Sequence, residues 1–574
     1  MSWKAWLSRQ VQQLQTRQDQ LSYVLALVIG ALTGASVVAF ILLTERLGMR
    51  LYPVGSGAWR RVLIPIIGSL GMGYLLFRYF PEARGSGVPQ TKAALFARNG
   101  VITARTALGK FFCTAATLAS GIPLGREGPS VQVGGGIASI LGRRLGLGTE
   151  NVKALIPVGA AAAIAAAFNT PLAGVLFSLE EIMGDLNAPV LGCVVLASAT
   201  SWLVLRALLG NNPLFHVPQY QLVNPIEFAI YAALGVVGGF VSAAFTKLLL
   251  EMRIRFLRAP TWTYWFQPVV GGVVAGLMGW FAPQVLGVGY GYVGDALNGR
   301  MPLRLMAFLV VLKLVATTTS YASGNAGGIF GPSLFIGAMF GGTVGSIAHG
   351  LLPNHTATAG AYALVGMGAA FAGIVRAPMT SVVMIFEMTQ DYAVIVPLMI
   401  SNLVSYFISS RLHREPIYEA LARQDGIHLP GGESRGDVGQ RRVVTAMRVA
   451  TEVMQSETTA REAFGRAQES DLDAWPLMDG SAVVGVVSLA QIEQTMANGE
   501  GAKKLRDIVE PNDFPHVHLD QPLHLALERM GAAKLDVLPV VSRANIHDLL
   551  GIVVARDVLR LYGVDRRGRS ESTQ

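Results

Sequence analysis

The chain contains few charged residues for its length. Only 14% of its 574 residues are Asp, Glu, Lys or Arg, whereas about a quarter of the residues of a soluble domain are charged. Hydrophobic residues make up 52%, and the mean hydropathy is +0.45. This composition excludes a soluble protein for most of the chain and places that part in a lipid bilayer.

Cysteine is almost absent as well. The two cysteines, Cys113 and Cys193, both lie in apolar segments, so we expect them to fill space and not to form a disulfide framework. The sequence also contains no His-Glu-x-x-His motif, the signature of a helix-borne zinc hydrolase. An intramembrane hydrolase therefore remains an alternative that no sequence motif supports.

Apolar runs recur between residues 23 and 409, the clearest being 23–44, 62–80, 154–179, 226–249, 303–319 and 361–375. A helix that crosses a bilayer needs about 20 apolar residues. Several runs are short or interrupted by Gly or Pro, which predicts broken or re-entrant helices. The first run follows about twenty polar residues without a small-residue cleavage site, so we expect a retained helix and no removable signal peptide.

Basic residues flank the apolar region. Lys4, Arg9 and Arg17 precede the first run, and Arg411 and Arg414 follow the last. By the positive-inside rule both termini are cytoplasmic, which requires an even number of crossings. The net charge of +9 is thus explained by membrane topology and lipid headgroups, and we expect no nucleic-acid partner.

The composition changes sharply near residue 425. Residues 425–442 are rich in Gly and charge and read as a linker. Beyond them, residues 475–496 and 538–563 repeat the plan strand, turn, strand, helix. The tail is therefore expected to be a soluble α/β unit made of two similar modules.

The apolar region contains a repeat of its own. Residues 158–181 align with residues 365–388 at one constant offset, which matches Glu180 to Glu387. Two membrane halves with corresponding Gly- and Pro-interrupted segments are typical of a transporter whose site lies between the halves near the middle of the membrane. The sequence leaves open whether the halves are inverted.

Three Gly-rich segments interrupt apolar sequence, each before a helical pattern: RGSGVPQ (84–90), GREGPSVQ (125–132) and GNAGGIFGPS (324–333). A helix that starts inside the membrane has unpaired N–H groups that carry about half a positive charge. Several such starts together form an anion site from backbone donors. The alternatives are a cation site, which would need carbonyls or several acids, and tight helix packing alone.

Four separated motifs, GSGVP, GREGP, GGIFGP and PIYEALAR, occur in this order. Together they resemble the CLC family of chloride channels and chloride/proton exchangers over about residues 22–425, and the tail resembles the paired CBS modules common in that family. The resemblance implies an all-α polytopic membrane protein with two internal repeats and broken, re-entrant helices, followed by an α/β CBS pair. The expected domains are an N-terminal cytoplasmic helix (1–21), a transport domain (22–424), a linker (425–442) and CBS modules (443–500 and 501–574).

Matched motif by motif, the resemblance implies an anion bound by the hydroxyls of Ser86 and Tyr418 and by the N–H groups of Ile329 and Phe330. It implies that Glu127 is the external gate, and the chemistry agrees: a carboxylate is itself an anion and can occupy an N–H-lined site until it is protonated. The residues expected to support the site are Gly85, Gly87, Pro89, Gly125, Gly128, Pro129, Gly328 and Pro332.

Four other charged residues of this region are expected to have supporting roles. Arg126 is expected to be a structural tether, since neighbouring helical residues do not face each other and a direct pair with Glu127 is disfavoured. Lys110 either raises the anion potential of the pathway or snorkels. Glu180 and Glu387, at equivalent repeat positions, suit helix-end packing or vestibule lining.

The resemblance implies that Glu181 is the internal proton-transfer glutamate of an exchanger. Family channels commonly have a non-titratable residue there, so Glu181 favours a chloride/proton antiporter over a passive voltage- or pH-gated chloride channel. Ser86 favours chloride, because nitrate-selective members tend to have proline at this position. The segment GNAGGIFGP departs from the commoner family pattern in having Gly331 before the proline, although the Gly-x-Phe-x-Pro skeleton is kept. We expect Gly331 to add local flexibility and to leave the central site intact.

Adenine nucleotides bind CBS pairs through a Gly-x-x-Ser/Thr-x-x-Asp signature. The corresponding residues are Gly485, Ser488 and Gln491 in one module and Gly551, Val554 and Asp557 in the other. Each copy lacks one polar position, so a structural or dimer-stabilising role is favoured over nucleotide sensing. A membrane-anchored sensor whose CBS tail binds a ligand is the other alternative.

The resemblance further implies a homodimer with one pathway per subunit and the CBS pairs meeting below the membrane. Chloride, protons and membrane lipid are the expected partners, and no cofactor, metal or enzymatic activity is expected. The chain is predicted to be a multi-pass protein of a bacterial inner membrane.

Overall fold

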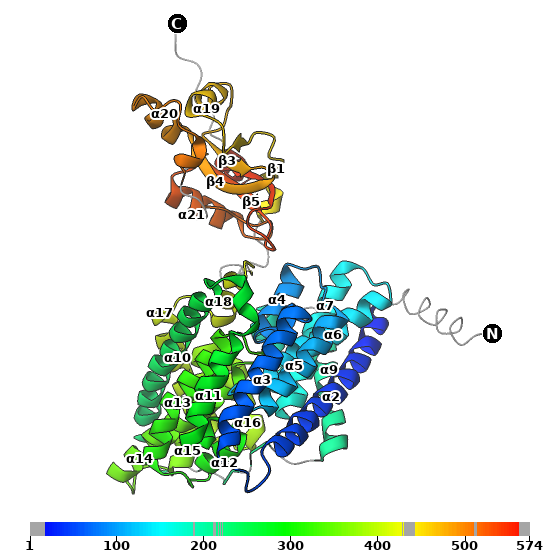
Figure 1. Cartoon of the computed structure of the whole chain (residues 1–574), viewed down its shortest axis with the longest axis vertical. Coiled ribbons are helices and arrows are strands. Elements are labelled where there is room, and N and C mark those ends of the chain that lie inside the picture. The colour runs from blue at the N-terminus through cyan, green and yellow to red at the C-terminus, as the bar shows by residue number, and fades with distance from the viewer. Residues whose placement is uncertain are drawn as a thin grey trace, which may run out of the picture. The chain divides into compact units, whose positions relative to one another are not determined.

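Helices dominate the first of the two units into which the chain divides, Met1–Gln424 and Asp425–Gln574. The computed structural model describes residues 18–186, 190–210, 214–215, 217–218, 220, 222–427, 429, 442–509 and 514–561. Most of the predicted N-terminal helix (1–21) and of the predicted linker (425–442) lies outside these residues. Figure 1 shows the first half of the helical unit, blue to cyan, beside its second half, green to yellow.

The α-helices of this unit are α2 (Gln18–Leu51), α3 (Trp59–Arg78), α4 (Val88–Phe96), α5 (Ala104–Ala119), α6 (Glu127–Arg144), α7 (Thr149–Phe168), α8 (Pro171–Phe177), α9 (Leu191–Leu209), α10 (Glu227–Leu257), α11 (Pro268–Phe281), α12 (Tyr290–Leu297), α13 (Leu303–Ala322), α14 (Phe330–Leu351), α15 (Ala359–Val375), α16 (Pro378–Thr389), α17 (Ile395–Leu412) and α18 (Ile417–Gln424). A π-helical turn, Ser178–Met183, continues α8.

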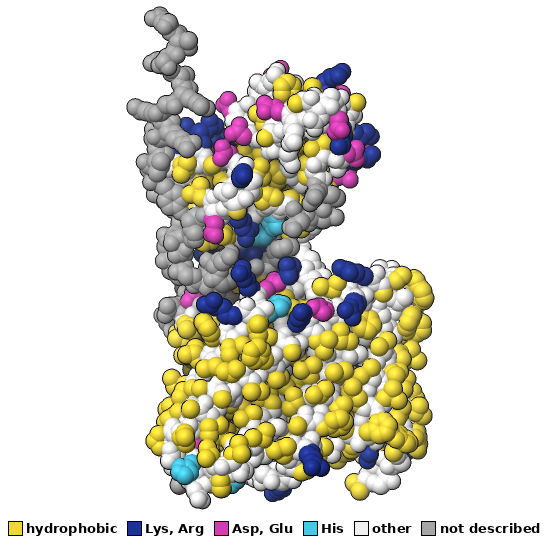
Figure 2. Space-filling view, turned by 90° about the vertical axis from the view of Figure 1, so that its left-hand side faces the viewer, with side chains coloured by type: hydrophobic (Ala, Val, Ile, Leu, Met, Phe, Trp, Pro, Cys, Tyr) yellow, Lys and Arg dark blue, Asp and Glu magenta, His cyan; other side chains and the backbone are white. Residues whose placement is uncertain are grey.

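Among the described residues, 8 helical segments are long and apolar enough to cross a membrane. Figure 2 shows hydrophobic side chains over the visible face of this unit, with Lys and Arg gathered toward its edges. Between the long helices lie short ones: α4 has 9 residues, α8 has 7 and α12 has 8. The prediction of a polytopic helical domain with broken helices is confirmed.

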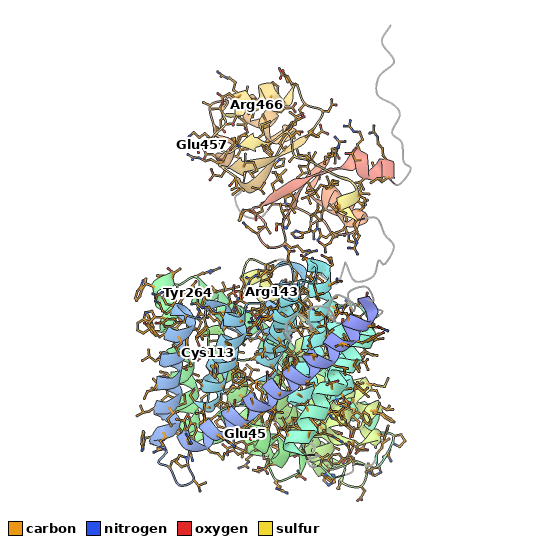
Figure 3. The ribbon with its side chains drawn as sticks, turned by 90° about the vertical axis from the view of Figure 1, so that its right-hand side faces the viewer. Glu45, Cys113, Arg143, Tyr264, Glu457 and Arg466 are labelled. Carbon is orange, nitrogen blue, oxygen red and sulfur yellow. The ribbon has the colours of Figure 1, made fainter. Side chains whose placement is uncertain are left out.

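The two cysteines form no disulfide. Neither cysteine takes part in a disulfide, and both side chains are buried. Figure 3 places Cys113 among the helices of the first unit, within its dense array of side chains. The expected packing role therefore agrees with the structure.

Close glycine contacts recur at equivalent places in the two repeats. At the crossing of α6 and α7, a Cβ on Gly134 would lie 2.3 Å from the carbonyl oxygen of Gly159, and one on Gly159 would lie 2.2 Å from that of Gly134. At the crossing of α14 and α15, a Cβ on Gly337 would lie 2.5 Å from the carbonyl oxygen of Gly366, and one on Gly366 would lie 2.4 Å from that of Gly337. Backbones approach this closely only where both residues lack a side chain.

Glu180 and Glu387 each cap a helix of the other repeat. Glu387 accepts hydrogen bonds of 2.9 and 2.7 Å from N–H groups in the first turn of α8. Glu180 accepts bonds of 3.2 and 2.8 Å from the first turn of α16. The start of each helix thus meets the end of the other, so α8 and α16 run antiparallel and the two repeats are inverted. Of the two roles considered for these acids, helix-end packing is the one observed.

The second unit contains β1 (Met447–Arg448), β2 (Met454–Gln455), β3 (Ala474–Asp479), β4 (Ala482–Ser488), β5 (Val537–Val541) and β6 (Leu549–Val554), with helices α19 (Ala460–Ala467), α20 (Leu489–Ala497), α21 (Leu523–Ala533) and α22 (Ala555–Leu561). The strands form two sheets of order β2-β3-β4 and β1-β6-β5. In both sheets an antiparallel pair is followed by a helix, which confirms the repeated strand–turn–strand–helix plan.

Replacing Gly159 by valine tests the α6–α7 crossing. We expect Gly159→Val to lower the free energy of unfolding by about 3 kcal/mol or more, because overpacking costs about 1–3 kcal/mol even where side chains can shift, and here the contact is with backbone. Size-exclusion chromatography after graded heating measures the effect. Gly71→Val is the control, since a Cβ on Gly71 of α3 meets nothing within 4 Å. Equal melting of both variants would contradict the prediction.

Candidate anion site

Three helices begin side by side in the interior of the first unit. Gly125 and Gly328 exchange two backbone hydrogen bonds, each 2.7 Å long, and the N–H of Gly327 donates to the carbonyl of Gly85 at 3.2 Å. These bonds join the three Gly-rich segments, which lie far apart in the sequence. The starts of α4, α6 and α14 therefore converge, with a proline in the first turn of each.

Glycine is required where these segments touch. Gly87 has φ of +106°, a conformation that favours glycine. A Cβ on Gly87 would lie 2.6 Å from the carbonyl oxygen of Gly128, and one on Gly128 would lie 2.6 Å from the hydroxyl of Ser86. The GSGVP and GREGP motifs thus supply the small residues that let α4 and α6 begin against each other.

Two hydroxyls face this convergence of helix starts. Ser86 and Tyr418 are fully buried, and neither hydroxyl has a hydrogen-bond partner within the described part of the chain. The two are neighbours, although Tyr418 comes from α18, at the other end of the unit's sequence. Buried hydroxyls without a protein partner suit a bound acceptor such as an anion.

Ile329 and Phe330 lie at the start of α14 and are buried. The Phe330 ring lies 6.0 Å from the Tyr418 ring and 5.2 Å from the rings of Phe177 and Phe371. Aromatic side chains therefore line the part of the site beside the two hydroxyls. An anion placed there would meet N–H and O–H donors in an otherwise apolar setting.

Glu127 is the first residue of α6 and is fully buried. One carboxylate oxygen accepts a hydrogen bond from the Tyr290 hydroxyl, and the other accepts one of 3.3 Å from the N–H of Gly331 in α14. The carboxylate therefore lies against the N-terminus of a helix from the opposite repeat, where negative charge is favoured.

Arg126 makes no described ion pair with Glu127. Its guanidinium lies over the Tyr290 ring, 5.5 Å from the ring centroid. The side chain is 8% exposed, and its Nε has no hydrogen-bond partner among the described residues. Arg126 thus tethers an aromatic ring, as a cation–π contact, and not the neighbouring carboxylate.

Two lysines are buried at equivalent places in the repeats. Lys110 donates to two backbone carbonyls just before α4, at 2.8 and 2.6 Å, and Lys313 donates to two just before α12, at 2.9 and 2.6 Å. Both side chains are fully buried, so Lys110 does not snorkel. The sequence interpretation missed Lys313, although it stands at the same offset from Lys110 as Pro332 does from Pro129.

Glu181 lies in the π-helical turn after α8 and is 3% exposed. Its carboxylate forms an ion pair of 2.8 Å with Lys92 of α4, and Lys92 also lies 3.8 Å from Glu419. π-Helical turns are frequent at functional sites. Lys92 was also missed, because its importance comes from Glu181 and Glu419, which lie far from it in the sequence.

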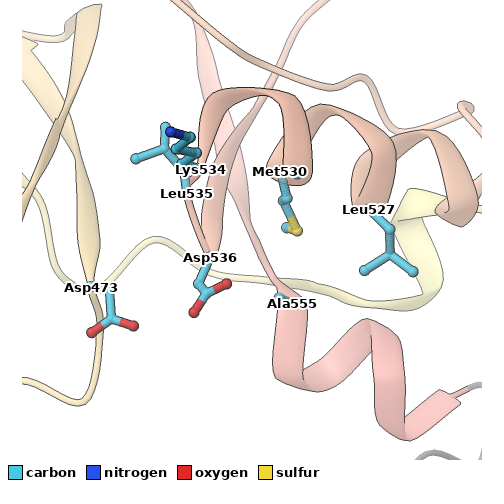
Figure 4. Close-up of a pocket in the computed structure, with 8 residues that line it drawn as sticks. Asp473, Leu527, Met530, Lys534, Leu535, Asp536 and Ala555 are labelled. Atoms are coloured by element: carbon cyan, nitrogen blue, oxygen red, sulfur yellow. The ribbon is translucent and has the colours of Figure 1, made fainter.

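A separate cavity of about 430 Å³ lies within the second unit, with Asp473, Asp536 and Lys534 among its lining residues (Figure 4). Burial and the nearby Asp536 carboxylate raise the pKa of Asp473. Asp557, the aspartate of the nucleotide signature in the second module, forms an ion pair with Arg448. The acid that a nucleotide would need is thus engaged by another part of the same unit.

Two family models match the sequence. One, described as voltage gated chloride channel, matches residues 68–410, and one for the CBS domain matches residues 505–563. The H(+)/Cl(-) exchange transporter ClcA of Vibrio campbellii is 34% identical over 354 residues, which cover 61% of this chain and 76% of that protein. The putative chloride channel protein ClcB-like of Ralstonia nicotianae is 33% identical over 386 residues, which cover 66% of this chain and 89% of that protein.

Solved structures share the fold. The crystal structure of a slow cyanobacterial Cl-/H+ antiporter has a TM-score of 0.66 and 27% identity, with 70% of this chain and 97% of that chain covered. A eukaryotic CLC transporter has a TM-score of 0.61 and 22% identity, with 94% and 98% covered. The second likeness extends over both units, so it concerns the fold of the tail as well.

Removing the Lys110 ammonium group tests how much its hydrogen bonds contribute to the stability of the fold. We expect Lys110→Met to lower the free energy of unfolding by about 1–3 kcal/mol, the cost of a buried carbonyl without a donor. The Ala83 carbonyl loses its donor, whereas the Gly85 carbonyl keeps the N–H of Gly327. Thermal unfolding of the purified chain measures the change. Lys247→Met is the matched control, since the Lys247 side chain on α10 is 72% exposed. A Lys110 variant as stable as this control would contradict the prediction.

Proposed function

The chain belongs to the voltage-gated chloride channel family, and on that premise we propose that it moves chloride across the membrane in exchange for protons. The observation that carries the proposal is the convergence of three helix starts on a buried carboxylate, Glu127. The relative that is named an H(+)/Cl(-) exchange transporter supports the same function. A secondary transporter of this kind carries out no covalent chemistry on its substrate.

We assign chloride to the space between the Ser86 and Tyr418 hydroxyls and the N–H groups of Ile329 and Phe330. Neutral donors hold an anion without the fixed cation that would slow its release. The Gly and Pro residues of the three segments, Gly85, Gly87, Pro89, Gly125, Gly128, Pro129, Gly328 and Pro332, bring the helix starts close enough to share one ion. Lys110 adds positive potential near α4 while it fixes the segment before that helix.

Glu127 would act as the external gate. As a carboxylate it occupies a position that an anion could take, with an N–H donor from the opposite repeat. Protonation removes its charge and therefore its attraction to that position. The arrival of a proton and the entry of chloride are then linked through one side chain.

Glu181 would pass protons to and from the inside. Its burial and its ion pair with Lys92 place a titratable group within reach of a second acid, Glu419, across one ammonium. A passive chloride channel is the alternative, supported by the relative named as a putative chloride channel protein. A channel would not need the Glu181 carboxylate to exchange protons.

The remaining assignments follow from the family. We infer a homodimer in a bacterial inner membrane, with lipid around it and both termini in the cytoplasm. Leu172 and Met379, at equivalent repeat positions, are 58% and 55% exposed, which suits contact with a second copy or with acyl chains. We assign the CBS pair a structural role without a nucleotide, because Arg448 engages Asp557.

Flux measurements in liposomes test the function. We expect a chloride gradient to drive protons uphill through the wild-type chain. Glu127→Gln removes the titratable group, so chloride movement should continue. Proton movement should fall by about a hundredfold or more, because a positioned acid–base group contributes about 10²–10⁴-fold. A chloride electrode and a pH electrode record both ions together. Chloride flux without proton flux in the wild type would favour the channel.

The internal route is tested separately by Glu181→Gln. We expect chloride flux to persist and proton flux to fall to background, since the amide cannot carry a proton. Glu251→Gln is the control, because the Glu251 side chain of α10 is 51% exposed and lies outside the site. Normal proton pumping by the Glu181 variant would remove this residue from the pathway and leave the assignment of Glu127 intact.

A further inference from the structure

Tyr290 makes a contact that none of the assigned roles uses. It is the first residue of α12 and lies outside all three Gly-rich segments. Its hydroxyl donates to one oxygen of Glu127, while the N–H of Gly331 donates to the other oxygen at 3.3 Å. The carboxylate is therefore held from two sides, by a backbone donor and by a phenol.

The Tyr290 ring is itself fixed in place. The Arg126 guanidinium lies over it, 5.5 Å from the ring centroid, and the Phe215 ring meets it edge to face at 5.8 Å. Both contacts have geometries that are favourable for an aromatic ring. A ring held in this way presents its hydroxyl to Glu127 with little loss of side-chain freedom when the bond forms.

Gly331 makes room for this arrangement. A Cβ at this position would lie 2.6 Å from Val288, 3.3 Å from the Tyr290 hydroxyl and 3.4 Å from the Glu127 carboxylate. Gly331 is also in the first turn of α14 and is buried. Gly331 thus leaves space for two polar groups that meet in front of the helix, and the expected local flexibility at this residue stays a prediction.

We propose that Tyr290 is a positioning residue that latches the Glu127 carboxylate in the anion site, with Arg126 holding the tyrosine ring. This inference rests on the proposed role of Glu127 as the gate. A hydrogen bond from a phenol is stronger to a charged carboxylate than to a neutral carboxyl group, so the latch holds the closed gate and weakens when Glu127 is protonated. Chloride that takes the position of the carboxylate, against the N–H of Gly331, must first displace the latched side chain.

The groups that face Glu127 are few in the described structure. Arg126 precedes it on the same segment, Tyr290 faces it from α12, and Tyr418 from α18 is within electrostatic reach. Among them, Tyr290 makes the described side-chain hydrogen bond to the carboxylate. Removing that one hydroxyl therefore changes the competition between Glu127 and chloride and leaves the ring contacts in place.

Chloride binding to the full chain in detergent, measured by isothermal titration calorimetry, tests the latch. We expect Tyr290→Phe to bind chloride at least about tenfold more tightly, because chloride then competes with a carboxylate that has lost its charge-assisted hydrogen bond. Tyr292→Phe, two residues further along α12, is the control and is expected to bind like the wild type. Equal affinity of the Tyr290 variant and wild type would overturn the proposal.

The same substitution in a Glu127→Ala background separates a latch from a structural effect. With no carboxylate to hold, Tyr290→Phe should leave chloride affinity unchanged, and a tenfold change there would overturn the latch. The proposed function has its own outcome. If wild-type liposomes show no chloride flux, the function fails; if Glu127→Gln uncouples protons while Tyr290→Phe changes nothing, only the latch fails.

Discussion

The candidate site of the first unit depends on the reciprocal pair of backbone hydrogen bonds between Gly125 and Gly328. These two bonds join the inverted repeats at the point where α6 and α14 begin. Because both helices start there, their unpaired N–H groups point at a shared space instead of at lipid. The third segment joins through Gly327 and Gly85, so one short β-like seam assembles a site from three separated parts of the chain.

The buried charges of the unit are handled in three different ways, and each way suits a different task. The ammonium groups of Lys110 and Lys313 donate hydrogen bonds to backbone carbonyls and so fix the segments before α4 and α12. Lys92 lies between two acids, which keeps three charges together in a medium that disfavours a lone one. Glu127 instead meets two neutral donors, the Tyr290 hydroxyl and the N–H of Gly331.

Much of this was predictable, and the reasons differ from residue to residue. Glycine and proline affect the backbone where they stand, so the motifs GSGVP and GREGP predicted helix starts from the sequence alone. The alignment that matches Glu180 to Glu387 predicted the internal repeat. Lys313 could have been found by applying the repeat offset to Lys110. Lys92 and Tyr290 could not, because their importance comes entirely from the partners that folding brings to them, and nothing in their sequence neighbourhoods identifies those partners.

The sequence by itself determined that the chain is a membrane protein of two repeats with broken helices and an α/β tail, since hydropathy, breakers and repeats are properties of local stretches. Only the tertiary structure decided that the repeats are inverted, that Glu180 and Glu387 cap each other's helices, and that Arg126 covers Tyr290. Those facts depend on the relative direction and distance of helices from opposite halves, and helix starts from opposite halves converge only when the two halves fold against each other.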